Sequence, residues 1–288
     1  MPSQREIRRR IGSVKNIKQI TRAMQFVAAS KLKRAQDATL QARPYREKLD
    51  EVIADVAAVL SHEDHPLLAR REGGTRLLVL FTTDRGLAGS LNTNTIRHIT
   101  REVAESTGDI RVVTVGRKGT AAMRRARVPV AAAFDGFGDK PDFASVLPLT
   151  RLITDDFLAG TYSRIDLVHP KFVSTLVQRP VVEALLPIEP SADTVGIPGN
   201  QFLWEPSAST VLEQLLPRYV ATRIFQAVLE TTASEQSSRM VAMRNATDNA
   251  QELIEDLTLT YNKVRQANIT REMIEIATGA SKIGRAHV

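Results

Sequence analysis

The chain has 288 residues, of which 43% are apolar and 5% aromatic, with a net charge of +7 and no cysteine. This composition excludes a disulfide framework, a thiolate nucleophile and a cysteine metal site, and it favours long helices over a large aromatic core. No apolar run approaches the roughly 18–20 residues of a membrane span, and the N-terminus lacks the apolar segment of a signal peptide. We therefore expect a cytosolic or membrane-peripheral protein.

Residues 1–61 are predicted to form a long coiled-coil helix. Ser3 and Glu6 have the spacing of a capping box, and apolar or small residues then recur at three- and four-residue steps. The first 36 residues hold ten basic side chains and one acidic side chain, a net charge of +9. A helix this basic is typical of binding to nucleic acid, an anionic membrane or an acidic protein socket, although a solvated face is an equally simple interpretation. Pro44 is expected to bend or interrupt the helix.

From Thr75 the period changes, and residues 75–189 are predicted to form a small Rossmann-like α/β domain with a largely parallel sheet. The expected strands are 76–82, 111–115, 130–134, 164–168 and 181–188, with residues 171–178 making a hairpin between the last two. The expected helices are 93–106, 120–127 and 142–159. Residues 190–208, rich in proline and glycine, are predicted to be a linker.

Residues 209–282 are predicted to form the second coiled-coil helix. A short helix begins at a capping box, Thr210 to Glu213, and Pro217 suits the first turn of a rod of roughly 95 Å. The two terminal helices most simply pair antiparallel, because each then buries the apolar stripe of the other. The rod is the longer of the two, so its portion from about Leu257 onward should project alone or enter a partner. The predicted fold class is α/β with long helices, an antiparallel coiled coil carrying an inserted α/β domain.

A polar turn that follows the first strand contains Asp84, Arg85, Gly86, Gly89 and Asn92. In an open α/β sheet this edge is where a phosphate or nucleotide would bind. The alternative is a tight glycine turn whose acidic and basic side chains contact backbone or a partner subunit. We favour the second interpretation, because no dinucleotide or P-loop glycine pattern matches. No HExxH motif or nucleophile elbow occurs either, so we expect no catalytic residue, cofactor or metal.

Several long segments resemble the gamma subunit of F-type ATP synthases. They are REIRRRIGSVKNIKQITRAMQFVAASKLKRAQ (5–36), TTDRGLAGSLNTN (82–94), HPKFVSTLVQRPVVEALLPI (169–188), FLWEPS (202–207), SEQSSRMVAMRNATDNA (234–250) and YNKVRQANITREMIEIATGAS (261–281). The last contains the signature Ile269-Thr270-x-Glu272-x-x-Glu275-x-x-x-Gly279-Ala280-x-Lys282. The family commonly has cysteine where this chain has Ala88.

This resemblance implies the rotor, or central-stalk, subunit of the synthase. Its implied partners are the hexamer of alpha and beta subunits, the epsilon subunit and the membrane c-ring, with one copy per complex. ATP chemistry would occur on the beta subunits, and the membrane would be touched only through the c-ring, on the cytoplasmic side of a bacterial cell membrane. The family positions that contact other subunits correspond to Met24, Arg239, Arg265, Gln266 and Thr270.

Two other functions fit parts of the sequence. A basic coiled-coil protein could bind nucleic acid through residues 5–34, although Phe26 is the one aromatic residue there for base stacking. An α/β nucleotide-binding enzyme would rest on the turn from Asp84 to Asn92 alone. The resemblance argues against nucleic acid as a partner. Residues 283–288 match the in-frame translation of a common sequencing adapter, so we expect them to be foreign.

Overall fold

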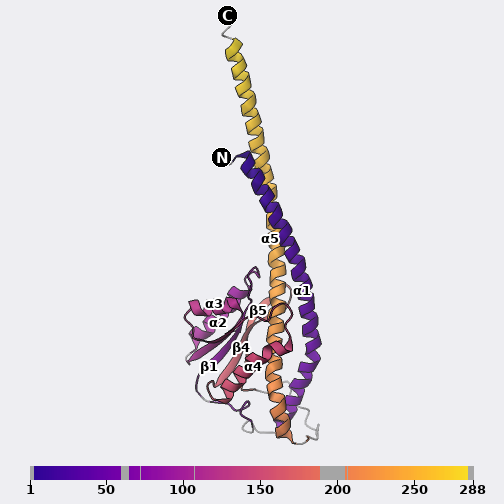
Figure 1. Cartoon of the computed structure of the whole chain (residues 1–288), viewed down its shortest axis with the longest axis vertical. Coiled ribbons are helices and arrows are strands. Elements are labelled where there is room, and N and C mark those ends of the chain that lie inside the picture. The colour runs from indigo at the N-terminus through magenta and orange to yellow at the C-terminus, as the bar shows by residue number, and fades with distance from the viewer. Residues whose placement is uncertain are drawn as a thin grey trace. The chain divides into compact units, whose positions relative to one another are not determined.

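The structure is a computed structural model that describes residues 3–59, 65–71, 73–106, 108–188, 205 and 207–284. It divides into two compact units, one formed by residues 28–241 and the other by residues 1–27 with 242–288. In chain order the elements are α1 (Gln4–Val59), β1 (Arg76–Phe81), α2 (Leu91–Glu105), β2 (Ile110–Val115), α3 (Arg117–Arg125), β3 (Val130–Phe134), α4 (Phe143–Leu158), β4 (Arg164–Phe172), β5 (Gln178–Leu186) and α5 (Ala208–Gly284), as Figure 1 shows.

The sheet lies in the unit of residues 28–241 and has the strand order β3-β2-β1-β4-β5. The four strands β1 to β4 run parallel, and β5 pairs antiparallel with β4 through the predicted hairpin. Residues Leu77 to Phe81 of the central strand are at most 1% exposed. A continuous apolar strand is expected at the centre of a parallel sheet that is covered on both faces.

Different helices cover the two faces of the sheet (Figure 1). On one face Ile99 of α2 and Met123 of α3 pack in a cluster with Leu78 and Leu80 of β1. On the other face, α4 and α5 pack on the alternate residues of β1 in the largest apolar cluster. α5 is therefore both a wall of the α/β core and a member of the long helix pair.

In the same unit, α1 runs antiparallel to α5. Leu32 and Ala35 of α1 share a buried cluster with Ala233 of α5, whereas Leu49, further along α1, joins the core that contains the earlier α5 residue Leu216. Alanines at the contact allow two helix backbones to approach closely.

The other unit repeats this antiparallel pairing with polar contacts. The Thr21 and Thr247 hydroxyl oxygens lie 2.8 Å apart, and Lys18 Nζ donates to Gln251 Oε1 at 2.6 Å. Near the start of α1, Gln4 Nε2 donates to the Tyr261 hydroxyl at 3.1 Å. Partner positions on α5 rise as those on α1 fall, so the predicted antiparallel coiled coil, and with it the fold class, is confirmed.

Beyond Tyr261, α5 continues past the first residues of α1 (Figure 1). Four large apolar side chains there are 48–72% exposed: Ile269, Met273, Ile274 and Ile276. The described residues offer this stretch no apolar partner. It corresponds to the part of the rod that we expected to project alone or to enter another subunit.

The structure differs from expectation at two prolines. Of the bend or interruption expected at Pro44, the interruption does not occur: α1 is continuous there, because Pro44 is exposed and the carbonyl that loses its hydrogen bond can be hydrated. α5 begins at Ala208 rather than at the Thr210 capping box or at Pro217, and Ser207 Oγ accepts the Thr210 N–H at 3.3 Å. Burial of the residues around Pro217, with Leu216 and Val220 fully buried, outweighs the lost hydrogen bond.

At the start of α1, Ser3 Oγ accepts the Glu6 N–H at 3.3 Å, as the capping-box spacing predicts. The predicted linker, apart from residues 205, 207 and 208, lies outside the described residues, as do residues 285–288. No helix in the described part of the chain is both long and apolar enough to span a bilayer.

Candidate functional site

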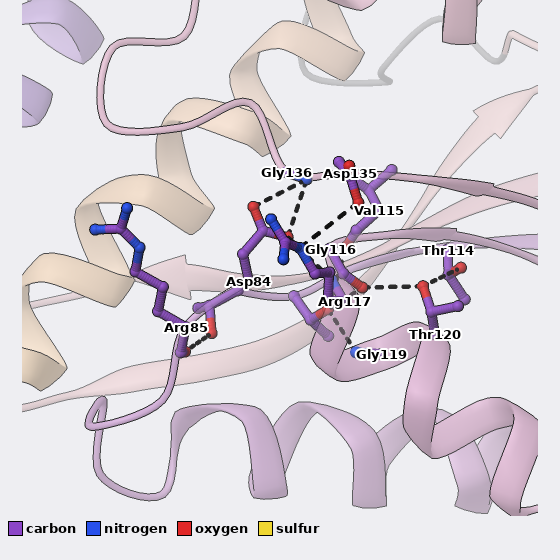
Figure 2. A network of polar contacts seen from close by, with 12 residues as sticks. Asp84, Arg85, Thr114, Val115, Gly116, Arg117, Gly119, Thr120, Asp135 and Gly136 are labelled. Atoms are coloured by element: carbon purple, nitrogen blue, oxygen red, sulfur yellow. Dashed lines mark hydrogen bonds and ion pairs between the residues drawn. The ribbon is translucent and has the colours of Figure 1, made fainter.

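The turn that follows β1 is held by the carboxylate of Asp84 (Figure 2). Asp84 Oδ1 accepts the N–H of Arg117, the first residue of α3, at 3.0 Å. Both carboxylate oxygens accept the N–H of Gly136, two residues after β3, at 3.1 Å. One side chain thus joins the loops that follow three neighbouring parallel strands. It also places a negative charge at the N-terminus of α3, the position that a phosphate would take in a nucleotide site.

The glycines that follow β2 serve a close approach of backbone segments. Gly116 has φ of +96°, and a Cβ there would lie 2.2 Å from the carbonyl oxygen of Thr82. Gly119 N–H donates to Thr82 Oγ1 at 2.8 Å, and Thr114 and Thr120 join their hydroxyls at 2.8 Å (Figure 2). Glycine is therefore required here for packing of β1 against the start of α3.

The rest of the turn is fixed by its own polar groups. Asn92 Nδ2 donates to Thr83 Oγ1 at 2.8 Å, and Thr83 Oγ1 donates to the Arg85 carbonyl at 2.6 Å. Asn92 Oδ1 accepts the Thr83 N–H at 3.2 Å. Leu87 and Gly89 have φ of +62° and +54°, a conformation that glycine adopts without strain and leucine does not.

Side chains of α5 donate hydrogen bonds to backbone carbonyl groups of this turn. Arg239 donates to the Gly86 carbonyl at 3.2 Å and pairs with Glu235 at 2.6 Å, with 11% of its own side chain exposed. Ser238 Oγ donates to the Ala88 carbonyl at 2.7 Å. Burial raises the pKa of Glu235, and the guanidinium of Arg239 opposes that rise. The structure thus uses Arg239, a predicted contact residue, in a contact within the chain.

A cavity of about 360 Å³ lies between the turn, the loop after β3 and α5. Its charged lining groups are Asp84, Arg85, Arg117, Asp139 and Glu235. Acidic and basic groups are mixed, and the described residues contain no cluster of carboxylates and histidines fit to hold a metal ion. The lining therefore selects neither an anion nor a cation.

The other predicted contact residues lie in the unit formed by residues 1–27 and 242–288. Met24 of α1 is half-buried, and Arg265, Gln266 and Thr270 are exposed on α5 beyond its contact with α1. Thr270 Oγ1 donates to the Gln266 carbonyl at 2.9 Å, one helical turn earlier. Arg265 has no ion pair within the described part of the chain. These three α5 side chains are available to another molecule.

Two charged contacts join the α/β domain to the long helices, and no local pattern in the sequence predicts them. Asp139 binds Lys31 at 2.6 Å, and this hydrogen bond lowers the pKa of Asp139. Glu183 of β5 lies 3.5 Å from both His169 of β4 and Arg223 of α5. Contact with His169 is the main cause that lowers the pKa of Glu183 from 4.5 to about 2, with Arg223 adding to it and burial opposing it.

Comparison with known proteins places these features in a family. The family model described as ATP synthase matches residues 3–283. A protein of Dehalococcoides mccartyi, named ATP synthase gamma chain, is 47% identical over 288 residues, covering 98% of this chain and 100% of that protein. The protein of the same name from Pelotomaculum thermopropionicum is 42% identical over 283 residues, with the same coverages.

Solved structures have the same fold. The central stalk and c-ring of Tetrahymena thermophila mitochondrial ATP synthase includes a chain that is 25% identical, with a TM-score of 0.62 over 79% of this chain and 99% of that one. A chain of the Euglena gracilis mitochondrial enzyme is 20% identical, with a TM-score of 0.69 over 99% of this chain and 96% of that one, which is a likeness of fold. From the family match and the identity along nearly its whole length, this chain belongs to the ATP synthase gamma chain family.

Proposed function

We propose that this chain is the rotor subunit of an F-type ATP synthase and transmits torque between the membrane c-ring and the hexamer of alpha and beta subunits. In this proposal residues 1–61 and 209–282 form the axle, and residues 75–189 form the domain that rests on the c-ring with the epsilon subunit. The observation that carries the proposal is the antiparallel pairing of α1 with α5, seen in the Thr21–Thr247 contact, in a chain of this family.

The proposal assigns ATP chemistry to the beta subunits and gives this chain a mechanical role. One copy would serve each complex, attached to the cytoplasmic side of the bacterial cell membrane through the c-ring. The bacterial relatives named ATP synthase gamma chain support this assignment. Nothing in the fold or the comparisons favours nucleic-acid binding, and Lys18 and Lys31 of the basic segment are engaged by Gln251 and Asp139 of the same chain.

We further propose that Arg265, Gln266 and Thr270 contact polar and acidic loops of the beta subunits. Arg239 is proposed to join them, and Met24 is proposed to lie near the bearing of the axle. The exposure of Arg265, Gln266 and Thr270 supports this role. A guanidinium can bind a carboxylate through two hydrogen bonds and so define a preferred rotor angle. Each contact should contribute only about 1–3 kcal/mol of binding free energy, because a more stable contact would hold the rotor at one angle and stop rotation.

Co-expression with alpha and beta subunits tests the proposal. The three chains should form a complex that hydrolyses ATP, and absence of such a complex would refute the rotor function. Within the complex, Arg265→Ala should lower coupled turnover without changing the helix content of the chain. Arg271→Ala is the matched control, since it removes the same charge from an exposed position on the same helix, at a variable position of the family signature. Equal turnover of the two variants would contradict the assigned contact.

A further inference from the structure

A single carboxylate, that of Asp139 in the loop between β3 and α4, holds both long helices to the α/β domain. Asp139 Oδ2 accepts from Lys31 Nζ of α1 at 2.6 Å. Asp139 Oδ1 accepts from Gln236 Nε2 of α5 at 3.4 Å. The two oxygens of one side chain therefore contact two helices, and these helices are antiparallel neighbours at this level, where Leu32 and Ala233 share a buried cluster.

The loop that carries Asp139 is itself fixed to the sheet. Gly136, three residues earlier, donates its N–H to Asp84, and Asp84 also accepts from the first residue of α3. The same turn contacts α5 through the Gly86 and Ala88 carbonyls. A force applied to the sheet thus reaches α1 and α5 through side chains anchored on the ends of β1 and β3.

Besides these contacts, α5 is hydrogen-bonded to β4, where Glu230 accepts the Phe172 N–H at 2.8 Å and Ser234 Oγ donates to the Pro170 carbonyl at 3.0 Å. It also packs on the sheet through apolar side chains. Apolar burial is non-directional and opposes separation more than rotation about the helix axis. Neighbouring helix axes lie about 8–10 Å apart. A bond from the domain to α1 therefore acts at that distance from the axis of α5 and opposes turning of the domain around α5.

We propose that Asp139, with Lys31 and Gln236, is the positioning group that fixes the angle between the α/β domain and the helix pair. The inference rests on the proposed rotor function, in which torque must pass between these parts. Lys31 and Asp139 have side chains 23% and 45% exposed, and ion pairs this close to solvent add little to stability. Loss of the Lys31–Asp139 pair should lower the torsional stiffness between the α/β domain and the helix pair, with little change in the melting temperature.

The test measures torsional stiffness in the complex with alpha and beta subunits. The hexamer is fixed to a surface, and a probe is attached to α2 through one introduced cysteine, since the chain has none of its own. The angular variance of the probe is recorded while a non-hydrolysable nucleotide holds the beta subunits. Asp139→Ala and Lys31→Ala are each expected to raise the variance about twofold, because a charge-assisted bond that opposes rotation is removed.

Asp135→Ala is the matched control. Asp135 is an acidic residue of the same loop, and its side chain is 80% exposed. Its ion-pair partner is Arg117 of α3, at 3.7 Å, and not a residue of α1 or α5. The exchange Lys31→Asp with Asp139→Lys restores the ion pair in reverse and should return the variance to the wild-type value. Asp139→Asn, which keeps the shape and part of the hydrogen bonding, should give an intermediate variance and serves if Asp139→Ala does not assemble.

Variance in Asp139→Ala, Lys31→Ala and Asp139→Asn equal to that of the control would overturn the inference, as would a charge exchange that leaves the variance high. Failure of the wild-type chain to assemble or rotate would instead count against the proposed function. A variance that rises with an unchanged melting temperature separates a positioning role from a merely structural one.

Discussion

Replacing Asp84 with alanine tests the feature that holds the turn after β1. The substitution leaves the N–H groups of Arg117 and Gly136 without their carboxylate acceptor. A hydrogen bond to a charged group contributes about 1.5–3 kcal/mol. Because 22% of the Asp84 side chain is exposed, water replaces part of each bond. We therefore expect Asp84→Ala to lower the free energy of unfolding of the α/β domain by about 2–4 kcal/mol.

Thermal unfolding of the isolated chain measures this loss, and amide hydrogen exchange locates it. A change of 2–4 kcal/mol in a unit the size of residues 28–241 corresponds to a decrease of about 4–16 °C in Tm. The amides of Arg117 and Gly136 should show the largest increase in exchange rate, because they lose their acceptor directly, whereas those of β1 should exchange faster only through the lower global stability. Asp135→Ala, at an 80% exposed position close by, should change Tm by about 1 °C or less. Equal melting temperatures of Asp84→Ala and Asp135→Ala would show that the Asp84 carboxylate does not hold the turn.

Two further substitutions probe the core and the junction of the sheet with α5. Gly116→Ala would place a methyl group 2.2 Å from the Thr82 carbonyl oxygen, so we expect the free energy of unfolding, measured with denaturant, to fall by about 3 kcal/mol or more. Gly12→Ala, in a helix with nothing within 4 Å, should instead raise it by about 1 kcal/mol. The reverse order of the two variants would contradict the geometry. Since the pKa of Glu183 is lowered to about 2, its ionised form stabilises the fold above pH 4.5, and this stabilisation is lost as the pH falls toward 2. Glu183→Gln should therefore cost about 1–3 kcal/mol at pH 7, after allowance for partial exposure, and progressively less below pH 4.5; a cost independent of pH would exclude this origin.

Local patterns predicted the elements well where one physical cause dominates. The apolar run from Leu77 to Phe81 identifies β1, because a strand buried on both faces needs no polar alternation. β5 begins earlier than expected, at Gln178, because Pro180 occupies an edge strand, where a missing N–H is tolerated. At Pro217 a proline suggests a helix start that does not occur, because α5 continues through it. Burial of the neighbouring residues keeps the helix continuous there, and local spacing does not reveal that burial.

The contacts of the site were harder to predict than the elements. Lys31 belongs to a basic segment for which the sequence suggests a binding surface or a solvated face, yet it binds Asp139, which lies 108 positions away. Arg239 is expected from the resemblance to contact another subunit, and within this chain its guanidinium also contacts Gly86. Neither pairing has a local signal, because periodicity fixes which face of a helix is buried but not which charged group meets it across the fold.

Joining the two ends of the chain covalently shows whether they turn as one axle. The Thr21 and Thr247 hydroxyls lie 2.8 Å apart, so Thr21→Cys with Thr247→Cys should form a disulfide in a chain that otherwise has no cysteine. In single complexes with alpha and beta subunits, ATP should drive full rotation of the α/β domain at a rate within about twofold of the reduced form, because α1 and α5 do not move relative to each other. Rotation that stops on oxidation and returns on reduction would show that α1 and α5 must move relative to each other, and would exclude a single axle.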